Sequence, residues 1–306
     1  MTSPPLRRVD PADFASVRGE IAALEAAARA HRGHESLGES AWRDLAHPAA
    51  DSVGFFAGSR AYMHVARAES GDPSSWTATF VADPANAATG AVTALLAAAL
   101  GHVADHDGRT LACWVAGATP ADDAEFSMLG FETRGTLFEM RAPLPIPVTA
   151  TLPTGFSVRA FEPGRDEADW LAVNNRAFAG HPDQGDWHEK TLRDRMAEDW
   201  FDASLFLLAF DAKGLAGFNW CKLHAARPPD PELGEIYVIG VDPRAQGTGL
   251  GRALATCGLH AVYAKGAVVG DLFSAADNTG ALALYRALGF SVHRTDRSYV
   301  RAIETR

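Results

Sequence analysis

The sequence has few cysteines, no long apolar run and no excess of positive charge. Its three cysteines, Cys113, Cys221 and Cys257, never form a C-x-x-C pair. Sparse, unpaired cysteines are typical of a reducing cytoplasm, so we expect no disulfide and no metal site, and each cysteine to act as a small buried hydrophobe. No apolar run reaches the ~18 residues of a membrane span and the N-terminus has no hydrophobic stretch, so we expect neither a span nor a signal peptide.

The charge balance excludes a further class of partner. The formal net charge is −10 at pH 7, and no basic block occurs, which argues against nucleic-acid binding. An acidic chain can still hold a small anion where the contact is local and made by backbone donors. With 306 residues and 47% hydrophobic content, the chain is long enough for two domains with ordinary cores.

A glycine-rich segment follows a β-branched stretch in the second half. Residues 238–241 favour a buried strand, which Pro243 ends because proline has no N–H for the ladder. Residues 246–251 then read Q-x-x-G-x-G and precede apolar residues at helical spacing. Glycines let successive N–H groups curl around an anion at a helix N-terminus, so the segment is typical of a pyrophosphate loop. The alternative is an ordinary glycine-rich turn.

Two other phosphate-binding loops are excluded by the spacing. No G-x-x-x-x-G-K-[ST] occurs, which argues against a P-loop kinase or ATPase. The glycines do not follow G-x-G-x-x-G and no alternating βαβ pattern precedes them, which argues against a dinucleotide fold.

A second motif lies downstream. Asp277-Asn278 supplies a candidate N-cap, apolar residues up to Leu288 form one helical face, and Gly289 is a candidate terminator. The two segments, in this order, resemble the acyl-CoA loop [RQ]-x-x-G-x-[GA] and the last helix of the GNAT N-acetyltransferase superfamily. The resemblance implies an α/β fold with a mixed, partly parallel twisted sheet flanked by helices.

The chain also contains an internal duplication. Three pairs of segments match at a common separation of 159 positions: residues 81–84 and 240–243, 89–90 and 248–249, and 129–131 and 288–290. We therefore expect two tandem GNAT-like domains, residues 1–145 and 154–306, joined by a proline-rich linker.

The two copies are not equal. The first copy keeps one glycine of the loop and no basic side chain there. Val92 stands where the second copy has Gly251, and valine does not easily adopt the positive φ open to glycine. We expect the first domain to be mainly a scaffold, and catalysis to belong to the second.

Longer stretches of the second half resemble the mycothiol synthase family of tandem GNAT acetyltransferases. The pattern N-N-x-A-F-x-G-H-P-x-Q-G-x-W ends at Trp187, and related pieces lie at residues 200–202, 217–222 and 234–243. The similarity is thin in the first half. Residues 272–275 read L-F-S-A where the family tends to have L-Y-V-E, and Asp183 replaces a glutamate. Both departures bear on the acceptor pocket.

The resemblance implies direct transfer from acetyl-CoA to the cysteinyl amine of Cys-GlcN-Ins, the last step of mycothiol synthesis. Glu235 is then the general base and Tyr285 the general acid. A glutamate near pKa ~4.3 is a weak base, but roughly a tenth of an α-amine is already neutral at pH 7. The alternatives are a surface ion pair for Glu235 and an aromatic packed on the sheet for Tyr285.

The remaining site residues also follow from the resemblance. Backbone groups of Ile239, Gly240 and Val241 are expected to bind the pantetheine arm and the thioester oxygen, with a β-bulge at Gly240 exposing the donors. Asn278 is a coenzyme contact or simply an N-cap, and Arg294 a phosphate contact or a solvated arginine. The expected pyrophosphate loop comprises Gln246, Gly247, Thr248, Gly249, Leu250, Gly251 and Arg252, and the expected acceptor contacts are Glu39, Asp183, Lys222, Glu235 and Tyr285.

The sequence thus predicts a cytoplasmic, monomeric N-acetyltransferase that uses acetyl-CoA as co-substrate and no metal. Its expected partner is a small pseudodisaccharide amine, with no nucleic acid and no membrane. Two alternatives stay open: a GNAT enzyme for another small amine, such as an aminoglycoside or amino acid, and a non-catalytic acyl-CoA sensor. Retention of Glu235 and Tyr285 favours an enzyme.

Overall fold

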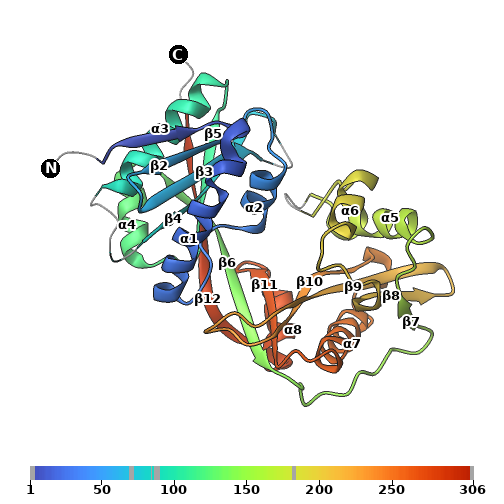
Figure 1. Cartoon of the computed structure of the whole chain (residues 1–306). Helices are drawn as coiled ribbons and strands as arrows, with labels where there is room; N and C mark the ends of the chain where they lie inside the picture. Colours follow the sequence, from blue (N-terminus) through green and yellow to red (C-terminus); the bar gives the residue numbers. More distant parts are fainter. Residues whose placement is uncertain (1–3, 69–71, 84, 86–89, 181–183, 304–306) are drawn as a thin grey trace. The chain divides into compact units, whose positions relative to one another are not determined.

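The chain folds into two compact units, each an α/β layer structure (Figure 1). The computed structural model describes residues 4–68, 72–83, 85, 90–180 and 184–303. Unit 1 comprises Met1–Leu137 with Arg294–Arg306, and unit 2 comprises Phe138–His293.

Unit 1 is a mixed sheet with helices on both faces. Its strands run in the order β1-β2-β3-β4-β5-β12, where only the pair β4–β5 is parallel among the registered neighbours. Its elements are β1 (Leu6–Val9), α1 (Phe14–Arg32), α2 (Glu39–Ala46), β2 (Val53–Ala57), β3 (Ala61–Arg67), β4 (Ser75–Ala82), α3 (Ala91–Asp105), β5 (Thr110–Val115), α4 (Pro120–Met128), the start of β6 (Glu132–Pro143) and the end of β12 (Ser291–Ala302).

Two apolar clusters cover the faces of this sheet. One packs α1 and α2 against Phe56, Tyr62 and Val81, and the other packs α3 and α4 against the alternate strand residues. This arrangement follows from strand geometry, since successive side chains point to opposite faces.

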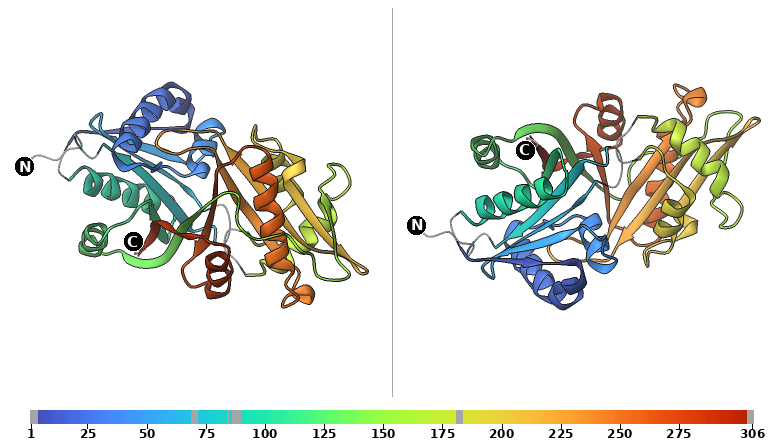
Figure 2. Two further views of the ribbon diagram at one scale, coloured as in Figure 1. Left: turned by 90° about the horizontal axis from the view of Figure 1, so that it is seen from below. Right: turned by 90° about the horizontal axis from the view of Figure 1, so that it is seen from above.

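Unit 2 repeats the same architecture (Figure 2). Its strand order is β6-β11-β10-β9-β8-β7, with β10 and β11 parallel and β7 to β10 antiparallel in sequence. Its elements are the end of β6, β7 (Ser157–Ala160), α5 (Glu167–Ala177), α6 (Glu189–Met196), β8 (Phe206–Asp211), β9 (Gly214–His224), β10 (Leu233–Val241), α7 (Leu250–Ala264), β11 (Val269–Ala275), α8 (Thr279–Ala287) and the start of β12.

The two faces of the unit 2 sheet carry different cores. The face under α5 and α6 is aromatic, with Trp170, Phe206 and Trp220 in mutual ring contact. The face under α7 and α8 is mainly aliphatic and includes Ile236 and Leu272. Side chains of β10 and β11 therefore point either into the aliphatic core or toward the α5–α6 face.

The duplication is confirmed at the level of single residues. The helices α3 and α7 begin at Ala91 and Leu250, and the next three elements also begin 159 positions apart in the two units. Gly90 and Gly249 cap these helices with left-handed φ values of 79° and 87°. The one loop glycine that the first copy keeps thus has the same backbone conformation in both copies, and this conformation favours glycine.

The compact units differ from the predicted boundaries at 145 and 154. The strand β6 passes from unit 1 to unit 2 at Phe138, before the proline-rich stretch, and β12 returns to unit 1 at Arg294. The composition does not change where β6 and β12 pass from one unit to the other. The prolines therefore mark a loop after β6 and not the boundary between the two units. Within the described residues, no helix combines the length and apolarity needed to cross a membrane.

Candidate active site

Glu235 lies at the third position of β10, between two other strands of unit 2. It is opposite Lys222 of β9 and Asp271 of β11, so these three side chains share the α5–α6 face. Glu235 is buried, and its Oε2 lies 2.6 Å from Nε2 of His224, the last residue of β9. The carboxylate is therefore held in a polar pair and is not a surface ion pair.

Lys222 is buried among aromatic rings. Its Nζ lies 4.5 Å from the centroid of the Trp200 ring and 5.7 Å from that of Tyr237. Cation–π contacts of this kind stabilise an ammonium group that has lost part of its hydration. The structure thus places a cation beside Glu235, as the register of β9 and β10 requires.

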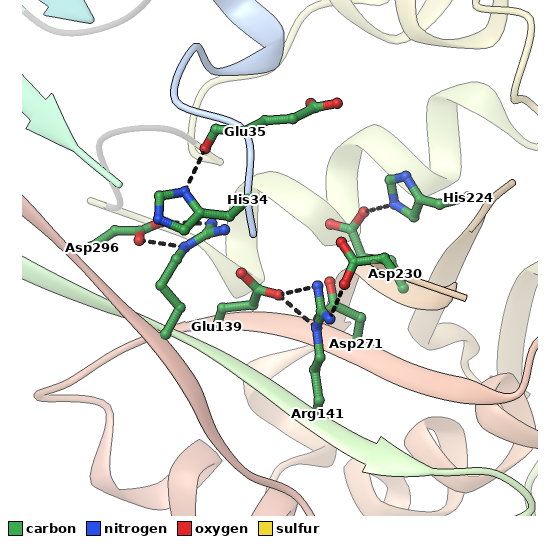
Figure 3. Close-up of polar contacts among 10 residues, drawn as sticks. His34, Glu35, Glu139, Arg141, His224, Asp230, Asp271 and Asp296 are labelled. Carbon is green, nitrogen blue, oxygen red and sulfur yellow. Dashed lines mark hydrogen bonds and ion pairs between the residues drawn. The ribbon is translucent and has the colours of Figure 1, made fainter. Parts of the chain in front are cut away.

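A cluster of charged residues that the sequence analysis missed includes Asp271, the residue opposite Glu235 on β11. Figure 3 shows this cluster around Arg141. The guanidinium of Arg141 on β6 contacts three carboxylates. Its Nε donates to Glu139 at 2.7 Å and to Asp271 at 3.2 Å, and its Nη1 donates to Asp230 at 2.6 Å. Figure 3 shows Arg141 pointing between these carboxylates, with the His224 pair nearby.

Asp271 is the most perturbed carboxyl of this cluster. Burial raises its pKa to about 9, and the charges of Glu139 and Glu235 act in the same direction while Arg141 opposes them. Burial and the neighbouring carboxylates thus favour the protonated form of Asp271, whereas Arg141 favours the charged form.

Tyr285 lies on α8, on the opposite face of the sheet from Glu235. Its ring packs in the aliphatic core with Ile236 and Leu272 and lies 6.0 Å from the ring of Phe290. Burial raises the pKa of Tyr285 to about 12. Among the described residues its hydroxyl makes no hydrogen bond, so it stays protonated and available to a ligand.

Cys221 links the environments of the two predicted catalytic residues. It is buried on β9 in the same core as Tyr285. Burial raises the pKa of its thiol, and the charge of Glu235 adds to this. The cysteine in turn contributes to the raised pKa of Tyr285. Cys113 is also buried, as predicted, whereas Cys257 is half-buried.

The strand β10 has a neighbour on both sides only along its first part. Its parallel pairing with β11 ends at Ile236, whereas its pairing with β9 continues to Val241. The predicted bulge at Gly240 is wrong, because the register shift lies between Ile236 and Val238. Gly240 remains paired, and its hydrogen faces the ring of Phe218, where a Cβ would come within 2.8 Å.

The glycine-rich loop leads from β10 into the start of α7. Gly247 and Gly249 have φ values of 75° and 87°, which favour glycine. Gly249 caps α7 without a side-chain acceptor, and no acidic residue lies in the first turn. Because the first N–H groups of a helix have no acceptor inside the helix, this terminus is suited to an anion.

Other contacts hold the loop in place. Arg176 donates to Asp242 at 2.6 Å, and the hydroxyl of Thr248 donates to the carbonyl of Ala245 at 2.7 Å. The amide of Gln246 donates to the carbonyl of Val241 at 3.3 Å. Gln246 therefore closes the turn between the strand and the loop.

The expected positive φ at Gly251 is wrong. Gly251 lies inside α7, outside the left-handed region, and a Cβ there would meet only Val241, at 3.6 Å. The valine in the first copy thus causes no backbone strain. The loop differs between the copies through its other residues and not through this conformation.

Two predicted coenzyme contacts have partners within the chain. The side chain of Asn278 accepts from the N–H of Ala281 at 3.1 Å and caps α8, which leaves the predicted coenzyme contact open. Arg294 is not a solvated arginine, because its Nε and Nη2 donate to Asp296 at 2.7 and 3.1 Å and its side chain is mostly buried. Arg294 belongs to unit 1.

The other predicted acceptor contacts are less defined. Glu39 is exposed in the first turn of α2, in unit 1. Asp183 lies outside the described residues. Within the described ranges, no group of three or more His, Cys, Asp or Glu residues is arranged to hold a metal ion.

Sequence signals for the missed residues exist. Asp271 is a lone carboxylate in an otherwise apolar strand, and buried strands seldom carry an unpaired charge. Glu139 and Arg141 alternate on β6, and His224 follows Lys222 by two positions on β9, which places each pair on one face. What these signals could not reveal is that β6, β11, β10 and β9 follow one another in the sheet.

Comparisons with known proteins identify the fold and the family. The sequence profile of the Acetyltransferase (GNAT) family matches residues 169–290, from α5 to the end of α8. Among solved structures, a GCN5-related N-acetyltransferase from Sphaerobacter thermophilus has a TM-score of 0.76 at 22% identity, covering 99% of this chain and 98% of that one. A tandem GNAT protein from the clavulanic acid biosynthesis pathway has a TM-score of 0.70 at 16% identity, covering 98% and 99%. These likenesses confirm the predicted tandem GNAT fold.

Curated relatives are more similar in sequence. A protein from Thermobispora bispora named mycothiol acetyltransferase is 44% identical over 66% of this chain and 69% of its own length. One of the same name from Sanguibacter keddieii is 42% identical over 74% of both chains. With a third from Streptomyces scabiei, the identity is 44% and the match spans 62% of that relative's length.

Proposed function

Since the chain belongs to the mycothiol acetyltransferase family of GNAT enzymes, we propose that it transfers the acetyl group of acetyl-CoA to the cysteinyl amine of Cys-GlcN-Ins. The course of β10 carries this proposal. The strand holds the buried Glu235, loses its parallel neighbour after Ile236 and leads into a helix whose glycine cap has no side chain and whose first turn has no acidic residue. Along β10 there follow, in order, the carboxylate proposed as the base, an edge without a neighbouring strand and a helix start suited to an anion.

Acetyl-CoA is proposed to bind along the second part of β10. The N–H groups at the start of α7 and the side chain of Arg252 hold the pyrophosphate, for which a helix terminus without an acidic side chain is suited. Backbone groups of residues 239–241 hold the pantetheine arm on the edge that β11 leaves. A donor there also stabilises the oxyanion that forms from the thioester carbonyl.

Glu235 is proposed to remove a proton from the acceptor amine. The neutral nitrogen attacks the thioester carbon, the C–S bond breaks, and the amide and coenzyme thiol leave. About a tenth of an α-amine is neutral at pH 7, so the base contributes a modest ~10²-fold. The raised pKa of Asp271 reduces the repulsion between this carboxyl and Glu235.

Tyr285 is proposed to donate a proton to the departing sulfur from the other face of the sheet. With a pKa raised to about 12 by burial, it stays protonated throughout the neutral range. A phenol this weak gives up its proton only as the thiolate develops negative charge. Its buried hydroxyl is suited to a hydrogen bond with the sulfur in the transition state.

Lys222, Glu39 and Asp183 are proposed to contact the hydroxyl and amine groups of the acceptor, by analogy with the family. Lys222 has support in its position opposite Glu235. Unit 1 is proposed to serve mainly as a scaffold, and the protein to act as a monomer without metal or nucleic acid.

Mass spectrometry of the reaction products tests the proposal. The purified protein is incubated with acetyl-CoA and Cys-GlcN-Ins, and in parallel with an aminoglycoside and free amino acids. We expect an acetyl group to be gained by Cys-GlcN-Ins. A gain restricted to other amines would favour the alternative enzyme, to which the L-F-S-A sequence of residues 272–275 points. Binding of acetyl-CoA without transfer to any amine would favour a sensor.

A further inference from the structure

The contact between His224 and Glu235 has a defined proton arrangement. The distance of 2.6 Å between Nε2 and Oε2 is that of a hydrogen bond to a charged acceptor. A carboxylate only accepts, so Nε2 of the imidazole must carry the hydrogen. In the neutral imidazole, Nδ1 is then the nitrogen without a proton.

The strand register explains why this pair forms. His224 follows Lys222 by two positions on β9, so both point to the same face as Glu235. The imidazole is about one third exposed, whereas the side chain of Glu235 is 12% exposed. The imidazole can therefore exchange protons with solvent while it holds a buried carboxylate.

We propose that His224 is a positioning residue for Glu235, which it orients through this hydrogen bond. This rests on the proposed function, in which Glu235 takes the amine proton. The neutral ring donates to Oε2 and leaves Oε1 for the amine.

The neighbouring charged groups have partners of their own. Arg141 donates to the carboxylates that it contacts, and the ammonium of Lys222 lies over the rings of Trp200 and Tyr237. The titratable and charged groups that adjoin the pair are Cys221 and Lys222 on β9, Asp271 on β11, Glu139 and Arg141 on β6, and Asp230 between β9 and β10.

Two variants separate positioning from packing. His224→Gln keeps a neutral amide donor, and His224→Ala removes the donor. We expect His224→Ala to lower kcat at pH 8 by about 10-fold or more, the worth of a hydrogen bond to a charged group, with little change in KM for acetyl-CoA. His224→Gln should retain most of kcat. His31→Gln, an exposed change on α1, is the control.

The comparison of the two variants is the decisive measurement. A positioning role requires that His224→Gln, which keeps a donor, retains far more of kcat than His224→Ala, while KM for acetyl-CoA changes little in both. Equal loss of kcat in both variants would overturn the role of His224.

A measurement independent of turnover keeps the two proposals distinguishable. Nitrogen NMR of the His224 ring at pH 8 should show Nε2 protonated and Nδ1 bare, whether or not the acceptor is Cys-GlcN-Ins. A ring protonated at Nδ1 alone contradicts the positioning role. If the NMR agrees but no amine is acetylated, it is the proposed function that fails.

Discussion

Glu235 and Tyr285 approach the β10–β11 pair from opposite faces of the unit 2 sheet. Glu235 points to the face shared with Lys222, and Tyr285 packs under the sheet against Ile236, the next residue of the strand. The two side chains make no direct contact, and the Cys221 thiol is influenced by Glu235 and in turn influences Tyr285. A base and an acid arranged in this way can act on two sides of one thioester.

Replacing the base should separate chemistry from binding. We expect Glu235→Gln to lower kcat by ~10²-fold at pH 7.5 while the affinity for acetyl-CoA stays within a factor of two, because the amide keeps the shape but not the basicity. Steady-state kinetics and calorimetry measure the two quantities. Glu232→Gln, an exposed change three residues earlier, is the control. Unchanged turnover in Glu235→Gln would remove it as the base.

Gly249 and Gly90 cap corresponding helices in the two units, so replacing each of them in turn tests which unit binds the coenzyme. Gly249→Ala and Gly90→Ala both place a side chain at a left-handed residue, with a similar strain of about 1–2 kcal/mol, and neither Cβ is crowded. We expect only Gly249→Ala to weaken acetyl-CoA binding, by 10-fold or more, as calorimetry would show. Equal weakening in both variants would assign the coenzyme to both units.

Tyr285→Phe tests the acid. We expect kcat to fall by about 10- to 100-fold and Tm to stay the same or rise, since the hydroxyl has no hydrogen bond among the described residues. Because burial raises the pKa of Tyr285 to about 12, the wild type should lose no activity through this group up to about pH 10.5. Tyr263→Phe on the exposed side of α7 is the control. An alkaline loss that disappears in Tyr285→Phe would contradict this assignment.

Asp271→Asn should make stability less dependent on pH. The unfolded carboxyl titrates near ~3.9, and the folded one is raised to about 9, so between these values the folded state binds one more proton. Stability therefore decreases as pH rises across this window, and asparagine removes that loss. We expect Tm of the variant to exceed that of the wild type by a few degrees at pH 8, and no gain at pH 4.

Thermal unfolding followed by circular dichroism at several pH values measures this difference. Asp277→Asn, at an exposed position after the same strand, should show no such pH dependence. A parallel fall of Tm with pH in wild type and Asp271→Asn would mean that Asp271 is ionised in the folded state.

Local patterns in the sequence determined the tandem GNAT fold, the helix beginning at Leu250 and the cap at Asn278. Glycine spacing, N-cap residues and the constant separation of the repeats are patterns in the sequence itself. They can therefore be recognised before the structure is known. The positions of Glu235 and Tyr285 followed from the same motifs through a family resemblance.

Only the tertiary structure decided which strands are neighbours. The Arg141 cluster joins residues from β6, β11 and the segment before β10, and His224 meets Glu235 across the β9–β10 pair. The bulge at Tyr237, the helical conformation of Gly251 and the pairing of Arg294 with Asp296 likewise depend on packing that local propensity does not encode. The pKa of a carboxyl between two strands depends on the register of the strands and on burial, and both are set by the sheet as a whole.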